Sequence, residues 1–188
     1  MLRPNVLCLL LALASASAFA QPNFNRPPGL DSTSRPAAKP ADVSSPDAII
    51  TAVYDVISGP AGQKRDWDRM RSLFVPNARL MPAVSRPGGA GTGVLILSVD
   101  DYIRQGGPGL EANGFFEREI RRVSESYGAV THLFSTYESR RLASDEKPFA
   151  RGINSFQLLK DGDRWWIVSI YWQQETPALP IPAKYLPE

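Results

Sequence analysis

The stretch FARGINSFQLLKDGDRWWIVSIYWQ, residues 149–173, decides the fold of this chain. It holds two runs rich in aromatic and β-branched residues, at 149–160 and 164–173, with Asp161 and Gly162 between them. An Asp-Gly pair between two such runs is the strongest short-range signal for a β-hairpin, because glycine adopts the positive φ that the tight turn needs. We therefore predict a final hairpin that turns at Asp161-Gly162, with Lys160 opposite Asp163.

The final strand of this hairpin is apolar on both faces. The predicted register places Trp165, Ile167, Ser169 and Tyr171 on one face, opposite Leu158, Phe156, Asn154 and Gly152. A sheet with one solvated side should alternate apolar and polar residues, so the other face also needs a cover. We predict that a second subunit covers it; the alternative is that the linker or the C-terminal tail folds back over it. The predicted homodimer interface consists of Arg151, Ile153, Trp166, Val168, Ile170 and Trp172.

Helices are expected before the sheet. Ser45 can cap a first helix that runs to about residue 58, and Asp66 can cap a second that Pro76 ends. Ser98 opens a third helix, which we expect to dissolve at the glycines of residues 106–109. Residues 115–127 and 129–140 read as two further strands. The order predicts one α+β domain, with three helices followed by an antiparallel sheet.

The two ends of the chain have a different composition. Residues 1–20 read as a signal peptide, with an apolar stretch shorter than the roughly 20 residues of a membrane anchor and an Ala-x-Ala site at residues 18–20. We therefore expect an exported protein, periplasmic or extracellular, without stable membrane insertion after cleavage. Residues 21–45 read as a disordered linker rich in Pro, Ser and Ala, and residues 176–188 as a Pro-rich tail.

Composition argues against several classes of function. The chain has 188 residues, 21 basic and 19 acidic side chains and a net charge of +2, and its arginines are scattered, so nucleic-acid binding is not expected. Its one cysteine, Cys8, lies in the predicted signal peptide, and its one histidine is His132. A mature chain with one histidine and no cysteine offers no ordinary metal site. The glycine-rich residues 86–93 lack a phosphate-binding motif, and we expect no cofactor.

Two segments together resemble the nuclear transport factor 2-like superfamily, close to its SnoaL-like branch. They are DWDRMRSLFVPNARL, residues 66–80, and DGDRWWI, residues 161–167. The resemblance covers about residues 46–175. It implies a cone, in which a curved sheet wraps around three helices and leaves a pocket at one end, and it implies frequent dimers. Members include isomerases and dehydratases as well as binding domains, so the fold does not choose between them.

The predicted pocket takes a small apolar or aromatic molecule. Its expected lining is Trp67, Asn154, Trp165, Ser169 and Tyr171. Tyr171 stands where members of this superfamily often carry a pocket histidine, and a phenol is a hydrogen-bond donor but a poor base near neutral pH. Tyr171, His132 and Asp68 are the weak catalytic candidates, and helix capping is the simpler interpretation of the aspartate.

Glu117 and Glu119 lie among arginines, and we interpret them as cross-strand ion pairs on an exposed face. The sequence thus favours an exported binding domain of unspecified role. The alternative is a cofactor-free isomerase or dehydratase that transfers a proton in the pocket. An ionisable side chain that points into the cone would favour the alternative.

Overall fold

The structure of the chain is a computed structural model that describes residues 35–188, so the predicted signal peptide and most of the predicted linker lie outside the described residues. Six strands form one sheet in the order β2-β1-β6-β5-β4-β3. The helices are α1 (Pro40–Val43), α2 (Pro46–Ile57), α3 (Trp67–Ser72) and α4 (Val99–Asn113), with short 3-10 turns η2 (Pro87–Gly89) and η3 (Ala183–Tyr185). The strands are β1 (Phe74–Ser85), β2 (Thr92–Val94), β3 (Phe116–Tyr127), β4 (Val130–Arg140), β5 (Ala150–Asp161) and β6 (Arg164–Gln174).

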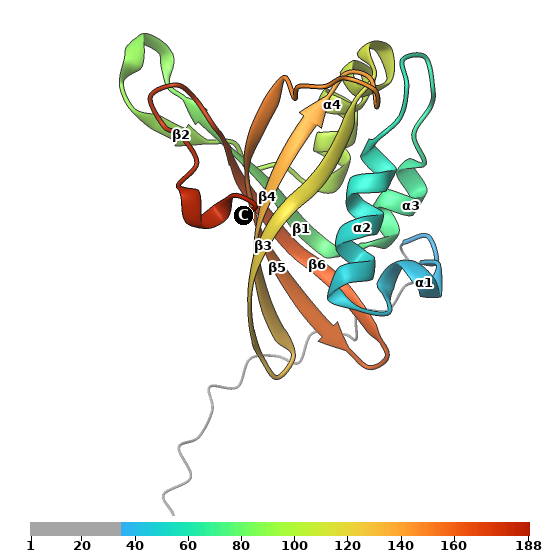
Figure 1. Ribbon diagram of the computed structural model, residues 1–188. Helices are drawn as coiled ribbons and strands as arrows, with labels where there is room; N and C mark the ends of the chain where they lie inside the picture. The colour runs from blue at the N-terminus through green and yellow to red at the C-terminus, as the bar shows by residue number, and fades with distance from the viewer. Residues whose placement is uncertain (1–34) are drawn as a thin grey trace, which may run out of the picture.

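The sheet is curved and unclosed, and the helices lie on its concave side (Figure 1). The predicted single α+β domain with a cone-shaped sheet is therefore confirmed. The sheet is mixed, however, and not purely antiparallel, because β1 runs parallel to its neighbour β6. A connection that passes through α4 and four strands separates β1 from β6 in the chain, and such a long crossover permits a parallel pair.

Side-chain caps fix the starts of the three main helices, as predicted. Ser45 accepts a hydrogen bond from the Ala48 amide at 3.0 Å, and Asp66 accepts one from the Arg69 amide at 2.8 Å. Ser98 and Asp101 form a reciprocal capping box at the start of α4. Each cap satisfies amide groups that have no partner within the first turn of the helix, which is why short polar residues favour these positions.

Two helical predictions need correction. α4 does not dissolve at residues 106–109 but continues to Asn113. Tertiary packing outweighs the low helix propensity here, because a Cβ atom on Gly107 would lie 2.9 Å from the Trp67 ring, so glycine lets the two helices approach closely. In addition, residues 40–43 of the predicted disordered linker form α1. Val43 is 4% exposed, and Asp42 pairs with Arg69 at 2.7 Å.

The predicted register of the β5–β6 hairpin was wrong. Asp161 pairs with Arg164, so Gly162 and Asp163 form the turn, and Gly162 has the positive φ of 56°. Val168 has no partner across the ladder, which makes a bulge between Gln157 and Leu158 of β5. Because one extra residue reverses the faces of everything beyond it, Asn154 lies opposite Trp172 and not opposite Ser169.

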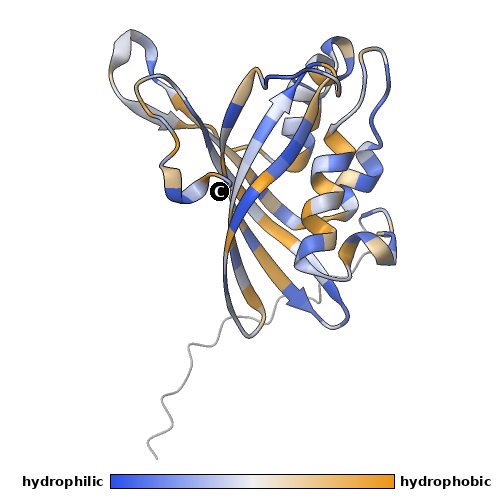
Figure 2. Ribbon diagram, viewed as in Figure 1, coloured by the Kyte–Doolittle hydropathy of each residue, from blue (hydrophilic) through white to orange (hydrophobic). Residues whose placement is uncertain are grey.

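The hydrophobic core lies between α2 and the concave face of the sheet. Figure 2 shows hydrophobic residues along α2 and along the strands that it covers. Ile49 and Ile50 of α2 pack in one cluster with Phe156 and Ile167 of the hairpin, and all four are at most 1% exposed. No helix within residues 35–188 is long and apolar enough to cross a membrane.

The C-terminal segment, residues 175–188, returns along the outer, convex face of the sheet (Figure 1). Thr136 on β4 donates a hydrogen bond to the Tyr185 carbonyl at 2.7 Å, and the Phe134 and Tyr185 rings lie 5.0 Å apart, edge to face. Arg121 on β3 donates to the Lys184 carbonyl at 3.0 Å. The C-terminal tail thus covers the part of the outer face that β3 and β4 form. A cover of this kind was the predicted alternative to a second subunit.

Candidate active site in the cone

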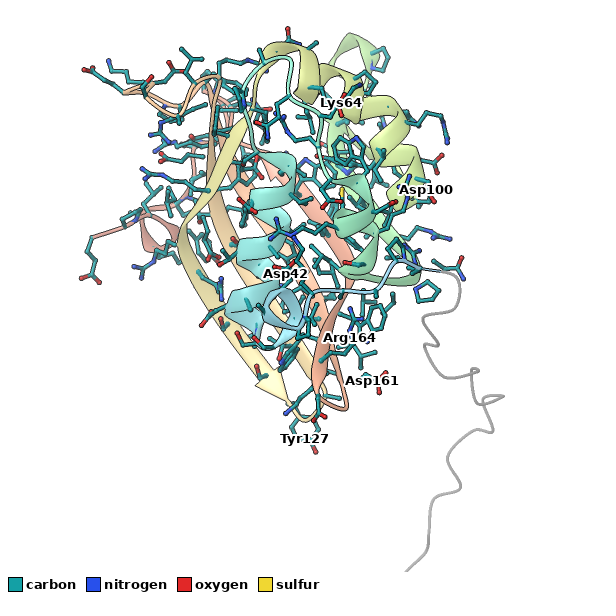
Figure 3. All side chains as sticks on the ribbon, turned by 90° about the vertical axis from the view of Figure 1, so that its right-hand side faces the viewer. Asp42, Lys64, Asp100, Tyr127, Asp161 and Arg164 are labelled. Carbon is teal, nitrogen blue, oxygen red and sulfur yellow. The ribbon has the colours of Figure 1, made fainter. Side chains whose placement is uncertain are left out.

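A cavity of about 210 Å³ lies between α2, α4 and the concave face of the sheet. Much of its lining comes from the end of the cone where β3 and β5 begin and where β4 and β6 end. Figure 3 shows Lys64 near this end, which we call the open end, and Tyr127 and Asp161 at the opposite end. The lining is Val53, Tyr54, Ile57, Met70, Leu80, Tyr102, Phe115, Glu117, Tyr137, Ser139, Phe149, Ala150, Asn154, Phe156, Ile170, Trp172 and Gln174.

Glu117 is the one carboxyl group that residues 35–188 contribute to this lining. It is the second residue of β3, and it pairs with Ser139 of β4, whose side chain also faces the cavity. Burial among aromatic side chains raises the pKa of Glu117 to about 7, while hydrogen bonds from Ser139 and Asn154 act in the opposite direction. The Ser139 hydroxyl donates to the carboxylate at 2.7 Å. A carboxyl with this pKa can both accept and donate a proton near neutral pH.

A second polar cluster fixes the wall beside Glu117. The Tyr54 hydroxyl of α2 lies 2.8 Å from Ser135 Oγ and accepts a hydrogen bond from Asn154 Nδ2 at 3.0 Å. Because each of these buried groups is paired, the cluster holds Tyr54 and Asn154 in one arrangement. The backbone amide of Glu117 donates to Ser58 Oγ at 3.0 Å, which ties β3 to the end of α2.

Two further phenols line the cavity without a hydrogen-bond partner among residues 35–188. They are Tyr102 of α4 and Tyr137 of β4, and in both, burial and the nearby Glu117 carboxylate raise the hydroxyl pKa. Both therefore remain protonated donors at neutral pH. Gly152 makes room for one of them, because a Cβ atom there would lie 2.5 Å from the Tyr137 hydroxyl oxygen. The cavity thus combines one carboxyl group of raised pKa with hydroxyl groups that have no partner among residues 35–188.

A wider polar cleft of about 780 Å³ lies on the other side of Glu117. It shares Tyr54 and Glu117 with the cavity, and Ser58, Arg118 and Asp145 also line it. The carboxyl group therefore stands between an apolar cavity and a polar cleft.

Only one of the five predicted pocket residues lines this cavity, and it is Asn154. Trp67 packs between α3 and α4 and donates from its indole nitrogen to Glu111 at 3.0 Å. Trp165 lies opposite Lys160, next to the turn at the other end of the cone. Ser169 and Tyr171 lie on the outer face, because the bulge in β6 reverses their direction, and Tyr171 is 47% exposed. Tyr171 therefore cannot act inside the cone.

The residues of the predicted dimer interface do not lie together on the outer face, and the bulge accounts for two of them. Ile170 and Trp172 face inward and line the cavity, where Trp172 packs edge to face with Tyr102 at 6.4 Å. Trp166 is 3% exposed beneath the Arg164 guanidinium. These three residues are not available to a partner on the outer face.

The other three interface residues remain on the outer face. Arg151 pairs with Glu175 at 2.8 Å and does not stack on Trp172. Ile153 lies beneath the C-terminal segment, in a hollow that Tyr185 also lines. Only Val168, at 38% exposure, stays open. The homodimer itself remains a prediction.

The two other catalytic candidates also lie outside the cavity. His132 is on the outer face, with its Nε2 atom 3.0 Å from Ser155 Oγ and its Nδ1 atom 3.7 Å from a carboxylate oxygen of Glu125. Asp68 is a surface residue of α3 that pairs with Arg71 at 2.8 Å. Within residues 35–188, no group of three or more His, Cys, Asp or Glu side chains is placed to hold a metal ion.

Sequence reasoning missed the residue with the most perturbed carboxyl group. Glu117 was interpreted as part of a surface ion-pair ladder because arginines follow it. Its neighbours Phe115 and Phe116 were the available signal, since an acid next to two phenylalanines at the start of a strand indicates an apolar environment. Glu119 does form an ion pair, with Arg122 at 2.6 Å, but the two residues lie on the same strand, β3, and the predicted cross-strand pair is not formed.

The chain matches no protein-family model and no curated protein. Among solved structures, a nuclear transport factor 2-like protein of unknown function from Silicibacter pomeroyi aligns with 69% of this chain and 92% of its own, at 17% identity and a TM-score of 0.47. A protein from Parabacteroides distasonis, described provisionally as a ketosteroid isomerase, aligns over 71% and 89% of the two chains, at 17% identity and a TM-score of 0.44.

A third neighbour comes from Streptomyces avermitilis and is described provisionally as a dehydratase of the nuclear transport factor 2-like family. It aligns with 74% of this chain and 100% of its own, at 15% identity and a TM-score of 0.45. Identities this low bear on fold alone. The strand order and curvature of the sheet around its helices show that the chain has the nuclear transport factor 2-like fold, and its place in the SnoaL-like branch stays a prediction.

Proposed function

We propose that the cone cavity binds a small apolar molecule that carries a carbonyl group, and that Glu117 moves a proton to and from it. The observation that carries this proposal is the position of Glu117, a partly buried carboxyl group with a pKa of about 7 in an aromatic cavity. A general acid or base works best when its pKa lies near the working pH. The ionisable side chain that would favour a proton-transfer enzyme over a binding domain is therefore present.

The chemistry follows from the residues around Glu117. In its ionised form, the carboxylate removes a proton from the carbon next to the ligand carbonyl, and the carbonyl oxygen gains negative charge. Tyr102 and Tyr137 stay protonated and have free hydroxyl groups, so they can donate hydrogen bonds to that oxygen. If a C=C bond adjoins that carbon, protonated Glu117 returns the proton to the far end of the conjugated system and the double bond shifts, which is an isomerisation. If the next carbon carries a hydroxyl group, protonated Glu117 gives its proton to that group as the C–O bond breaks and water leaves, which is a dehydration.

Binding without turnover is the second candidate function. The observation in its favour is the lining, which apart from Glu117, Ser139, Asn154 and Gln174 consists of aliphatic and aromatic side chains suited to holding a small molecule. In this case Glu117 would only accept or donate a hydrogen bond to the ligand. The two candidates differ in whether Glu117 exchanges a proton with carbon.

Deuterium exchange separates the two candidates. Small apolar ketones are incubated in D2O with the wild-type protein, and deuterium incorporation next to the carbonyl is followed by NMR. We expect the wild type to accelerate exchange and Glu117→Gln to lose about 100-fold or more of this rate. Glu119→Gln is the matched control, because Glu119 is on the same strand and binds Arg122.

Each outcome of this experiment decides a specific point. Equal exchange rates in the wild type and in Glu117→Gln would remove the catalytic proposal. Saturable ketone binding that depends on Glu117 without any exchange would leave the binding function in its place.

We also propose that the domain works after export. The support is the composition of residues 1–20, with a basic start, a short apolar stretch and a cleavage site before Gln21. N-terminal sequencing of the protein purified from its producing cells should begin at or near Gln21. A mature protein that starts at Met1 would contradict export by this route.

A further inference from the structure

The open end of the cone leads from the cavity into a second hollow. This hollow has a volume of about 320 Å³, and it shares Phe149, Ala150 and Gln174 with the cavity. Phe149 is 47% exposed, so its ring is both part of the cavity wall and part of the outer surface. A ligand longer than the cavity would extend past Phe149 into this hollow.

Arg141 lies against the ring that separates the two spaces. Its guanidinium carbon is 4.2 Å from the centroid of the Phe149 ring, and the Phe115 ring packs on the same phenylalanine at 6.2 Å. One guanidinium nitrogen donates to the Gly114 carbonyl at 3.4 Å. The Asp145 carboxylate accepts a hydrogen bond from the backbone amide of Arg141 at 3.1 Å, which fixes the start of the loop between β4 and β5.

The charge of Arg141 has no carboxylate partner among residues 35–188. This distinguishes it from Arg151, the cation that lines the hollow, because Arg151 is bonded to both carboxylate oxygens of Glu175 at 2.8 and 3.1 Å. A guanidinium group has five N–H donors, and one of those of Arg141 is used in the side-chain contact with Gly114. Arg141 can therefore bind a carboxylate through two parallel hydrogen bonds.

Residues 35–188 place no cation in the lining of the cavity itself. Its lining includes no lysine, arginine or histidine, and its one ionisable carboxyl is Glu117. An anionic group of a ligand is therefore disfavoured deep in the cone, next to that carboxylate, and favoured at the open end, next to Arg141.

We propose that Arg141 binds an anionic group of the ligand at the open end, so that the ligand is a small apolar carboxylic acid whose uncharged end reaches Glu117. This inference rests on the proposed ligand-binding role of the cavity and adds the substrate class. Arg141 sets specificity, while Glu117 performs the chemistry.

Two probes that differ in one charged group test the proposal. They are 4-ethylphenol and 3-(4-hydroxyphenyl)propionate, which share a phenol for the Glu117 end, and only the second carries a carboxylate. Dissociation constants are measured by titration calorimetry on the protein of residues 21–188. We expect the wild type to bind the carboxylate probe more tightly than 4-ethylphenol. Arg141→Gln should raise the dissociation constant of the carboxylate probe about tenfold and leave that of 4-ethylphenol unchanged.

Three controls sharpen this comparison. Arg141→Lys should retain part of the preference, because it keeps the charge but loses the paired donors. Arg104→Gln removes an exposed arginine that pairs with Asp101 on α4, and it should leave both probes unchanged. The unfolding midpoint of each variant shows that loss of binding does not come from unfolding.

The outcomes separate this inference from the function on which it rests. One outcome overturns the assignment of Arg141 and keeps the ligand-binding role of the cavity. In this outcome 4-ethylphenol binds and Glu117→Gln weakens its binding, but Arg141→Gln changes the affinity for both probes equally or for neither. If neither probe binds, or if Glu117→Gln changes neither, the proposed cavity function fails and the substrate class fails with it.

Discussion

Glu117→Gln should stabilise the folded protein at high pH, while it removes the proposed proton carrier. The pKa of Glu117 is about 7 in the folded protein, against an ordinary value of 4.5. The folded state therefore holds this proton more tightly than the unfolded state. The stability that the protonated carboxyl provides is fully present below pH 4.5 and is lost as the pH rises through 7.

The size of this effect follows from the difference in pKa. About 2.5 pKa units, at 1.36 kcal/mol each, give a loss of about 3 kcal/mol in the free energy of unfolding when Glu117 ionises. The partial exposure of the side chain makes this an upper value, so we expect about 2 to 3 kcal/mol. Glutamine has nearly the same shape and can still accept the Ser139 hydrogen bond, but it has no charge to desolvate.

Urea denaturation of the wild type and of Glu117→Gln at pH 4.5, 6, 7 and 8.5 measures this difference. The variant should match the wild type at pH 4.5 and exceed it at pH 8.5, which for a domain of this size corresponds to roughly 5 to 10 °C in the thermal midpoint. Other carboxyl groups titrate equally in both proteins and cancel. A stability difference that does not change between pH 4.5 and 8.5 would refute the reasoning.

Four further outcomes are expected. Ser139→Ala should raise the pKa of Glu117 further, because the hydrogen bond that it removes stabilises the carboxylate. ¹³C NMR titration of labelled glutamate measures this pKa, and an unchanged value in the variant would show that the contact is absent in solution. Gly107→Ala should lower the free energy of unfolding by about 1 to 3 kcal/mol, because the added methyl group would overlap with Trp67. Gly106→Ala should be neutral or stabilising, because the nearest atom to a Cβ atom there is 4.0 Å away. Equal effects of the two substitutions on stability would contradict this packing. If a second copy covers the exposed part of the outer face, as we propose, light scattering should find a dimer for the wild type and a folded monomer for Val168→Asp. A protein that ends at Gln174 should expose Phe134 and bind a hydrophobic dye more strongly than the full chain, and equal binding would show that the tail does not cover this face.

Local signals were sufficient for the starts of α2, α3 and α4 and for the existence of the β5–β6 hairpin. Ser45, Asp66 and Ser98 cap helices because their oxygen atoms satisfy free amides, and this depends on neighbouring residues alone. The hairpin was equally local. The register of the hairpin could not be predicted from neighbouring residues, because the position of the turn and the unpaired Val168 depend on how β6 packs between β5 and β1. One bulge is enough to turn Tyr171 to the outer face and Trp172 into the cavity.

The candidate site depends on contacts between distant parts of the chain, and this is why sequence patterns missed it. Glu117 of β3, Asn154 of β5 and Tyr54 of α2 meet only after the sheet has curved around α2. Glu119 has the same residue type two positions along and forms an ordinary ion pair with Arg122. The difference between the two acids is their surroundings, of which the two phenylalanines before Glu117 are the one local sign in the sequence.

The surroundings of Glu117 also bear on function through stability. A chain that needed only to fold would gain from an uncharged residue at this position, because an ionised carboxyl in an aromatic cavity costs about 2 to 3 kcal/mol above pH 7. Ser139 and Asn154 lower this cost without removing it, and they leave the pKa close to neutrality. Stronger compensation, such as an arginine in contact with the carboxylate, would lower the pKa and leave a carboxylate too weakly basic to exchange protons efficiently near pH 7. The absence of any cation from the lining is therefore consistent with a proton carrier and gives the fold itself no advantage.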